Sequence, residues 1–392
     1  MGQNSYVVSA SRTAIGKFGG ALQDKTAVDL GVEVTGHVIR QSGIPAESVD
    51  HLVFGNARQA GCGPNPARQI ACRAGIPQER ASFTVNMACA SGMKSIALGA
   101  ERIGAGKADV VVCGGTESMS RLPYYVEGLR FGVKMGHQQL VDGMYRDGFL
   151  CPIAQMIMGE TAEKLGLMYG ISRVEQDEYA LESQSRAAAA RTRISDEIAP
   201  VAISDRKKGT RMFIEDEHPR PDTTLEELQQ LSPVFNREGT ITAGNASGIT
   251  DGASAVLLLS ERALNRFGVK PLARIIDFEE AGVDPTIMGI GPVPATRTLL
   301  DRTGISANAI DVIEINEAFA AQVLACLRDL PFDRKRVNVN GGAIALGHPI
   351  GCTGARIVVT LLHEMCRRSA RYGLATLCVS GGMGMSMLFE RV

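Results

Sequence analysis

Cys89 is the residue of this sequence whose surroundings best suit a nucleophile. It lies in residues 86–92 (NMACASG), between a short apolar run at residues 81–85 and a stretch with apolar residues at helical spacing over residues 93–103. A helix N-terminus carries unpaired N–H groups and about half a positive charge, which favour a thiolate over a thiol and can receive an oxyanion. A lone cysteine is more often a core residue, so this assignment depends on partners elsewhere in the chain.

Two glycine-rich segments near the C-terminus supply candidate partners. Residues 338–354 (NVNGGAIALGHPIGCTG) place His348 directly before a second predicted helix, where Pro349 would stiffen the backbone that holds the ring. Residues 374–384 (LATLCVSGGMG) end an apolar strand at Cys378, and the glycines that follow let the backbone approach a ligand closely. The sequence thus offers two thiols and an imidazole for one site.

Two more segments, residues 244–253 (GNASGITDGA) and 316–320 (NEAFA), complete a set of five. In their order along the chain, the five segments resemble those of the thiolases, a family of acyl-CoA C-acyltransferases, and the resemblance covers essentially the whole chain. The resemblance implies an α/β fold with duplicated halves, each with a mixed five-stranded sheet, layered αβαβα, plus an inserted loop domain. It also implies that the inserted domain covers the tail of CoA and contributes to oligomer contacts.

An internal repeat supports the duplication. Residues 43–50 (GIPAESVD) are echoed by residues 304–311 (GISANAID), and each segment is followed by a strand-like run. Strands alternate with helices in each half, which predicts mostly parallel sheets with right-handed crossovers. The predicted units are residues 1–117 (N-terminal half), 118–248 (inserted loop domain) and 249–392 (C-terminal half), with residues 249–270 as a strand that the N-terminal half can regain.

Within the insertion, two helices are predicted, at residues 159–169 and 174–193. Ser172 precedes the second as an N-cap, with Glu175 three positions further on. The basic run at residues 206–208 is interpreted as a solvated turn.

Composition and charge exclude several classes of protein. A balance of 41 basic and 42 acidic residues gives a formal charge of −1, so no basic field for nucleic acid is expected. The nine cysteines lack CxxC or CxxH spacing, which argues against a zinc site or a disulfide framework and for a reducing compartment. No secretion signal, bilayer-length apolar run, or nucleotide-binding glycine motif is found. We therefore expect a soluble cytoplasmic protein that needs no metal, no membrane and no permanently bound cofactor.

Carbon–carbon bond transfer between thioesters requires two thiol roles. One thiol holds the acyl group covalently while CoA leaves, and the other moves a proton on and off the carbon alpha to a thioester carbonyl. We assign the first role to Cys89 and the second to Cys378, with His348 taking the Cys89 proton. The resemblance implies oxyanion donors from His348 and a water held by Asn316 on one side, and from the N–H groups of Cys89 and Ser380 on the other. From sequence alone, a helix cap is an equally good role for Asn316.

Substrate contacts come only from the resemblance. Arg220 and Ser247 match family positions that bind CoA, and Met158, Met288 and Phe319 match positions around the acyl pocket. Each of these residue types alone would more often be an ordinary surface or core residue.

Two residues depart from the family pattern. Ile157 precedes Met158 where thiolases specialised for acetoacetyl-CoA commonly have histidine, which predicts a more apolar acyl pocket that accepts longer or branched 3-oxoacyl chains. Ser380 stands where the family usually has glycine, and a positive φ there would strain a serine and lower activity.

The expected activity is cleavage of 3-oxoacyl-CoA by CoA, or the reverse condensation, in fatty acid metabolism such as β-oxidation. The resemblance implies a homo-oligomer, at least a dimer, and residues 132–136 (GVKMG) resemble the loop that joins dimers into a homotetramer. The alternatives are a 3-oxoacyl synthase-like condensing enzyme, which would depend on acyl carrier protein, and a non-catalytic acyl-CoA-binding homologue, in which Cys89 would not be acylated. A cysteine hydrolase would leave Cys378 without a role.

Overall fold

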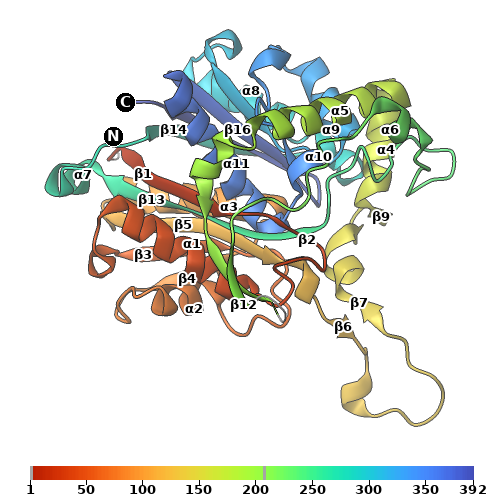
Figure 1. Ribbon diagram of the computed structural model, residues 1–392, viewed down its shortest axis with the longest axis horizontal. Coiled ribbons are helices and arrows are strands. Elements are labelled where there is room, and N and C mark those ends of the chain that lie inside the picture. Colours follow the sequence, from red (N-terminus) through yellow and green to blue (C-terminus); the bar gives the residue numbers. More distant parts are fainter. Residues whose placement is uncertain (1–2, 206–208) are drawn as a thin grey trace.

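The computed structural model describes residues 3–205 and 209–392. The strands of the N-terminal half are β1 (Ser5–Thr13), β2 (Gly16–Lys17), β3 (His51–Gly55), β4 (Ser82–Val85), β5 (Val110–Ser118) and β13 (Thr250–Ser260). Those of the C-terminal half are β14 (Ala273–Gly282), β15 (Val312–Ile315), β16 (Tyr372–Val379) and β17 (Met383–Glu390). They form one continuous sheet in the order β15, β16, β17, β14, β1, β13, β5, β3, β4, with β2 paired to β13 (Figure 1).

The two halves pair their strands in the same pattern. In the first, β1 with β13 and β13 with β5 are antiparallel, and β5 with β3 and β3 with β4 are parallel. In the second, β14 with β17 and β17 with β16 are antiparallel, β16 with β15 is parallel, and a parallel bridge from Ile313 to Val337 takes the place of the fifth strand. The predicted duplication is therefore confirmed. The two half-sheets join where Tyr6 and Val7 of β1 pair with β14.

The echoed segments occupy the same structural position in each half. Helices α1 (Ala27–Ser42) and α8 (Pro292–Thr303) end at Gly43 and Gly304, whose φ angles of 69° and 68° suit glycine. Asp50 and Asp311 then precede β3 and β15, and each carboxylate accepts two backbone N–H groups at the start of the neighbouring strand.

Helices and sheets alternate in layers. Helices α1 and α2 (Pro66–Arg73) pack on the outer face of the first half-sheet, while α8 and α9 (Ala320–Asp329) pack on the outer face of the second. Between the half-sheets lie α3 (Ser91–Gly104) and α11 (Ile350–Arg368), which share one apolar core with both. Glycines bring these two helices close together: a Cβ on Gly92 would lie 2.7 Å from the backbone nitrogen of Ala355, and one on Gly354 would lie 2.6 Å from that of Met93.

The segment between β5 and β13 carries the remaining helices and short strands of the region predicted as an insertion. They are β6 (Tyr124–Tyr125), β7 (Val141–Asp142), β8 (Leu150–Cys151), β9 (Met156–Ile157), α4 (Met158–Met168), α5 (Arg173–Ala190), β10 (Ile198–Ala199), β11 (Val201–Asp205), β12 (Gly209–Phe213) and α6 (Leu225–Gln230). The two predicted helices are confirmed as α4 and α5, and Ser172 and Glu175 form the predicted capping box of α5. The basic run at residues 206–208 lies outside the described residues. The proposed unit boundaries stay a prediction.

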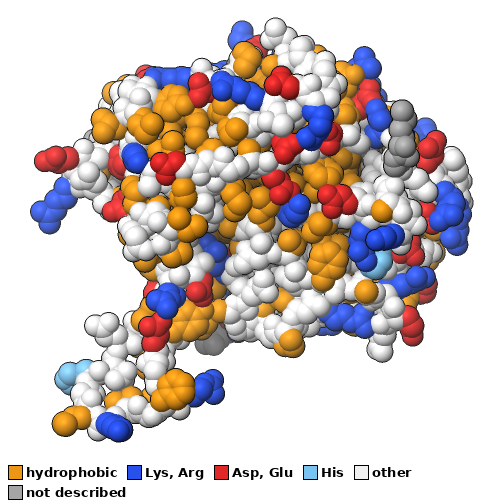
Figure 2. Space-filling model, turned by 180° about the vertical axis from the view of Figure 1, so that it is seen from behind, with side chains coloured by type: hydrophobic (Ala, Val, Ile, Leu, Met, Phe, Trp, Pro, Cys, Tyr) orange, Lys and Arg blue, Asp and Glu red, His pale blue; other side chains and the backbone are white. Residues whose placement is uncertain are grey.

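An arm formed by β6, β7 and the chain between them stands away from the body of the molecule (Figure 1). Hydrophobic side chains lie on its surface (Figure 2), among them Phe131 and Met135, which are 90% and 92% exposed. Elsewhere, α7 (Glu261–Phe267) follows β13 and α10 (Ala343–Leu346) precedes α11. In the described ranges, the structure contains no helix long and apolar enough to cross a membrane.

Candidate active site

Cys89 is presented by a strained turn between β4 and α3, which we call the Cys89 turn (residues 86–91). Ala88 has a φ of 43°, in the left-handed region that residues with a Cβ rarely adopt. Asn86 holds this conformation by accepting the N–H of Ala88 at 2.9 Å, and the Ser91 hydroxyl donates to the Ala88 carbonyl at 2.7 Å. These hydrogen bonds hold the turn at Ala88 and so fix the position of the Cys89 thiol.

His348 faces that thiol from the start of α11. Its Nε2 lies 3.3 Å from Cys89 Sγ, and its Nδ1 lies 2.6 Å from Thr353 Oγ1. The Thr353 hydroxyl donates to the carbonyl of Pro349 at 3.0 Å, so it can only accept from Nδ1–H. This arrangement fixes the tautomer in which the Nε2 lone pair points at the thiol.

Both members of this pair are neutral at rest. Burial, with the positive charges of Arg356 and Arg58, lowers the pKa of His348 to about 3. Burial also raises the pKa of Cys89, although Arg58 and the backbone N–H groups of Ser380 and Cys89 lower it. The backbone N–H groups at this turn favour the thiolate, but desolvation outweighs them, so the thiol needs a base to take its proton. An uncharged base facing a thiol can still take its proton as the sulfur attacks.

Cys378 is the penultimate residue of β16, lies in an apolar cluster and is 1% exposed. The cluster contains Met158, Ala162, Phe235, Ile241, Ala246, Met288, Ala318 and Phe319. Burial, followed by the nearby Cys89 and Cys326, raises the pKa of Cys378 well above its ordinary value. The structure thus surrounds the second thiol with three of the predicted acyl-pocket residues.

Asn316 follows β15, and its backbone N–H donates to the carbonyl of Thr376, two residues before Cys378. The side chain is fully buried, yet neither its Oδ1 nor its Nδ2 has a hydrogen-bond partner among the described residues. Helix α9 begins later, with Phe319 as its N-cap residue, so Asn316 does not cap it. An unpaired buried amide favours a role towards a ligand.

Ser380 avoids the strain that a positive φ would cause. The left-handed positions of this turn fall on Gly381 and Gly382, with φ angles of 93° and 86°, and Ser380 is not among the residues with positive φ. Its N–H is one of the backbone groups that lower the pKa of Cys89. The serine side chain is thus compatible with the backbone role expected at this position.

The predicted CoA residues lie on two segments that meet beside His348. Arg220 is exposed and forms no ion pair within the part of the chain that the structure describes. His218 packs so closely on Gly248 that a Cβ there would lie 1.9 Å from its Nε2. The carbonyl of Gly248, which follows Ser247, accepts the N–H of His348 at 2.9 Å.

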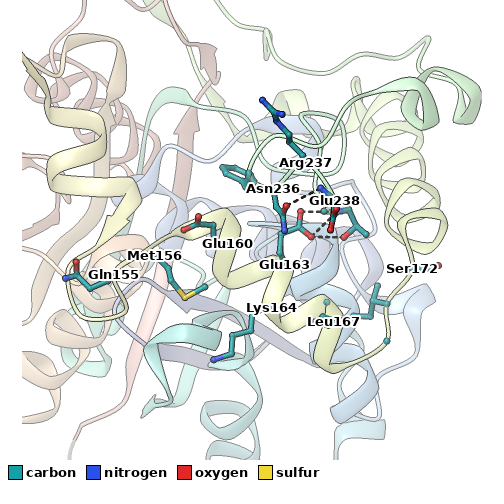
Figure 3. A pocket seen from close by; sticks show the side chains of 16 residues that line it. Gln155, Met156, Glu160, Glu163, Lys164, Leu167, Ser172, Asn236, Arg237 and Glu238 are labelled. Atoms are coloured by element: carbon teal, nitrogen blue, oxygen red, sulfur yellow. Dashed lines mark hydrogen bonds between the residues drawn. The ribbon is translucent and has the colours of Figure 1, made fainter.

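A groove of about 1060 Å³ lies between α4 and residues 235–240 (Figure 3). Phe235 lines the groove and also packs edge-on against Phe319, with ring centroids 6.1 Å apart, so it separates the groove from the Cys378 cluster. Ile157 is not in that cluster. It precedes α4, and its N–H donates to Glu160 at 2.7 Å.

Two residues that hold this geometry, Arg58 and the buried Glu117, lie outside the five sequence segments. Asn86 and Thr353 lie inside those segments, but their type and spacing gave no sign of their roles. The only hint for Glu117 is a carboxylate at the end of a strand that is buried throughout. All nine cysteines are free, and the described residues contain no group of three or more His, Cys, Asp or Glu arranged to hold a metal ion.

Comparisons with known proteins agree along the full length. The family model for the thiolase N-terminal domain matches residues 5–262, and that for the thiolase C-terminal domain matches residues 269–391. Acetyl-CoA acetyltransferases of Pseudomonas aeruginosa and Escherichia coli are 50% and 49% identical, covering 99% and 100% of this chain and 100% of each relative. The crystal structure of human mitochondrial 3-ketoacyl-CoA thiolase matches with a TM-score of 0.97 at 44% identity, covering 100% of this chain and 99% of that one. A structure of human mitochondrial 3-ketoacyl-CoA thiolase in complex with CoA matches with a TM-score of 0.95 at 43% identity, covering 100% of this chain and 98% of that one.

Proposed function

The chain belongs to the thiolase family of acyltransferases, and we propose that it cleaves 3-oxoacyl-CoA with CoA, or condenses two acyl-CoAs, through an acyl-Cys89 intermediate. The observation that carries the proposal is the 3.3 Å contact between Cys89 Sγ and the Nε2 lone pair of His348. The second buried thiol, Cys378, can move the proton at the alpha carbon, a role that a cysteine hydrolase does not need. Apolar side chains surround Cys378, and Cys89 lies close enough to raise its pKa.

In the first half-reaction, Sγ of Cys89 attacks the 3-oxo carbonyl while its proton passes to His348 Nε2. The oxyanion accepts hydrogen bonds from the N–H groups of Cys89 and Ser380. The carbon–carbon bond then breaks, its electron pair forms the enolate of the departing acetyl-CoA, and the Cys378 thiol protonates the alpha carbon. His348 Nε2–H and a water held by Asn316 stabilise the enolate oxygen.

In the second half-reaction, the Cys378 thiolate takes the proton of the incoming CoA thiol, and the CoA sulfur attacks the acyl-Cys89 carbonyl. The Cys89 thioester bond breaks, and His348 returns a proton to the leaving thiolate. Cys89, Cys378 and His348 then all have their starting protonation states. The cycle is of the ping-pong type, because the acyl group stays on Cys89 between the two half-reactions, and it also runs in reverse. Arg220 and Ser247 hold CoA at the mouth.

The acyl specificity is part of the proposal. Met158, Met288 and Phe319 form an apolar wall beside Cys378. We assign to this pocket 3-oxoacyl chains that are longer than acetoacetyl or branched, because this wall of apolar side chains suits an apolar chain.

The remaining biological assignments are a cytoplasmic location, a role in fatty acid metabolism such as β-oxidation, and a homotetramer built from dimers. The exposed hydrophobic side chains of the arm support the tetramer, because several apolar side chains gathered on one projecting segment suit burial against another copy. CoA is the only cofactor-like ligand proposed, and it acts as a substrate.

The test is steady-state cleavage of 3-oxoacyl-CoAs of increasing chain length by wild type, Cys89→Ala and Cys378→Ala. Both variants should lose turnover, but Cys378→Ala should still form acyl-Cys89 from acyl-CoA, visible by mass spectrometry of the intact protein. A steep loss of kcat/KM beyond acetoacetyl-CoA would overturn the specificity assignment. A wild type that binds CoA without turnover would indicate an acyl-CoA-binding homologue, and a requirement for acyl carrier protein would indicate a synthase.

A further inference from the structure

Glu117 is a fully buried carboxylate at the end of β5 whose hydrogen-bond partners are all N–H donors. Its Oε1 accepts from Asn56 Nδ2 at 2.6 Å and from the backbone N–H of Arg58 at 3.1 Å. Its Oε2 accepts from the backbone N–H groups of Gly351 at 2.8 Å and Ala57 at 3.3 Å. One side chain therefore connects the loop after β3 to the start of α11.

Both connected segments lead directly to the reacting pair. Gly351 lies in the first turn of α11, just after His348. On the other side, the carbonyl of Ala57 accepts from Asn86 Nδ2 at 3.1 Å, and Asn86 Oδ1 accepts the N–H of Ala88 in the Cys89 turn. The chain of hydrogen bonds from the nucleophile segment to the base segment thus passes through Glu117.

The ionised carboxylate fits these four donors better than any neutral replacement. Burial raises the pKa of Glu117 to about 7, and Arg58 and the backbone N–H groups of Gly351, Arg58 and Ala57 oppose that rise. A protonated carboxyl or an amide would set one of its own hydrogens against an N–H group. The four donors therefore favour the ionised form of Glu117, in which both oxygens accept hydrogen bonds.

The sheet itself does not require this carboxylate. Val111 of β5 pairs with His51, and Gly373 of β16 pairs with Val312, so the position of Glu117 corresponds to Val379 in the second half. There an apolar residue ends the equivalent strand. The carboxylate is thus particular to the half that carries Cys89.

We propose that Glu117 is a positioning residue for acyl transfer, whose four hydrogen bonds hold the Cys89 turn and the His348 segment at the separation that proton transfer requires. The inference rests on the proposed function for its catalytic meaning. Its geometric part concerns only the reactivity of one thiol, which is measurable without turnover.

The experiment compares Glu117→Gln with wild type in the rate at which iodoacetamide alkylates Cys89, followed by mass spectrometry of the Cys89 peptide between about pH 6 and pH 9. We expect the variant to react about 10-fold more slowly and to lose a similar factor in kcat, while KM for acyl-CoA changes less than about two-fold. Asp50→Asn is the matched control, since that carboxylate also accepts two backbone N–H groups but lies at the opposite end of the strands. Its alkylation rate should equal that of wild type.

A folded Glu117→Gln with the wild-type alkylation rate at every pH would overturn the inference. If that variant fails to fold, Asn86→Asp provides the test: it keeps the acceptor for the Ala88 N–H and loses the donor to the Ala57 carbonyl. Alkylation slowed by about three-fold or more supports the inference, and an unchanged rate overturns it. Failure of the proposed function alone would show as absent turnover with this alkylation difference intact.

Discussion

The two halves of the molecule share their strand order, so each catalytic position has a counterpart that can be read from the strand register. Thr116 stands in β5 where Cys378 stands in β16, five residues beyond the paired positions His51–Val111 and Val312–Gly373. By the same register, Gly55 corresponds to Asn316. The halves are alike at one end of their strands and different at the end where the chemistry takes place.

The difference has a steric basis. A Cβ on Gly55 would lie 2.4 Å from the backbone of Ser91, so in the N-terminal half the first turn of α3 fills the space beside this strand end. In the C-terminal half the same position holds the unpaired amide of Asn316. The first half has become the support of the nucleophile, and the second half supplies the base, the second thiol and the ligand-facing amide. Neither half contains a complete site.

The most severe way to break this division of labour is to remove the base that the C-terminal half contributes. His348→Asn should lower kcat/KM by about 10³-fold or more, because His348 is the side chain that faces the Cys89 thiol among the described residues. Steady-state kinetics and Cys89 alkylation both report the loss. His363→Asn, on the same helix but bonded to the carbonyl of Ala10, is the control and should stay within about two-fold of wild type. Equal losses in both variants would contradict the assignment.

A sharper comparison sets Asn316 against its counterpart Gly55. Asn316→Ala should reduce kcat by about 100-fold through loss of enolate stabilisation, yet leave the melting temperature unchanged, because its side chain makes no hydrogen bond in the described fold. Gly55→Ala, by contrast, should lower the unfolding free energy by about 1–3 kcal/mol, because the added Cβ would force the start of α3 away. Kinetics and thermal unfolding of both variants test this contrast. Full activity in Asn316→Ala would remove that residue from the site.

Of the reacting pair, His348 should make the free energy of unfolding depend on pH in the acid range. His348 has a pKa of about 3 when folded, far below the usual value near 6.5, so the unfolded chain binds more protons between these values. The free energy of unfolding should therefore fall as pH drops, by about 2–3 kcal/mol from this residue between about pH 6.5 and pH 4.5. Cys89, with a raised pKa, stays neutral in both states over this range.

Urea unfolding of wild type and His348→Asn across that pH range measures the effect. The variant should show the shallower dependence of unfolding free energy on pH, whatever its absolute stability. Parallel curves would mean that the buried imidazole is not neutral in the folded protein.

The smallest predicted effects concern Asp50 and Asp311, at the end of the strands where the two halves have the same structure. Asp50→Asn and Asp311→Asn should each lower the unfolding free energy by about 1 kcal/mol, because each removes charge from a carboxylate that accepts two backbone N–H groups. Activity should stay within about two-fold of wild type in both. Denaturant unfolding and kcat/KM check the pair. A catalytic defect in only one of them would show that the halves differ at this end as well.

Sequence reasoning reached the fold and the central residues through local patterns. The repeat of GIPAESVD and GISANAID predicted the duplication, and Cys89, His348 and Cys378 were located by their glycine-rich or helix-leading surroundings. These features are properties of short segments, which a sequence displays directly. The order of the five segments supplied the family.

What sequence reasoning missed depends on contacts between distant segments. Glu117 meets Gly351 across 234 positions, and no spacing rule marks such a pair. The raised pKa of Cys89 has a related cause, because burial is set by the whole fold and not by the segment around the thiol. For Ser380, the strain depended on which residue of the turn takes the positive φ, and the structure places it on Gly381 and Gly382.

Because α3 and α11 cross closely, substrate specificity can change in evolution without a change in the catalytic geometry. Because glycine backbones at Gly92 and Gly354 set the gap between the helices, the distance from thiol to base does not depend on the size of core side chains. The acyl pocket, by contrast, is made of exchangeable apolar side chains such as Met158 and Met288 on other elements. Substitutions there can alter the preferred substrate while the reacting atoms keep their spacing, so the fold can drift to new chain lengths without rebuilding its reaction.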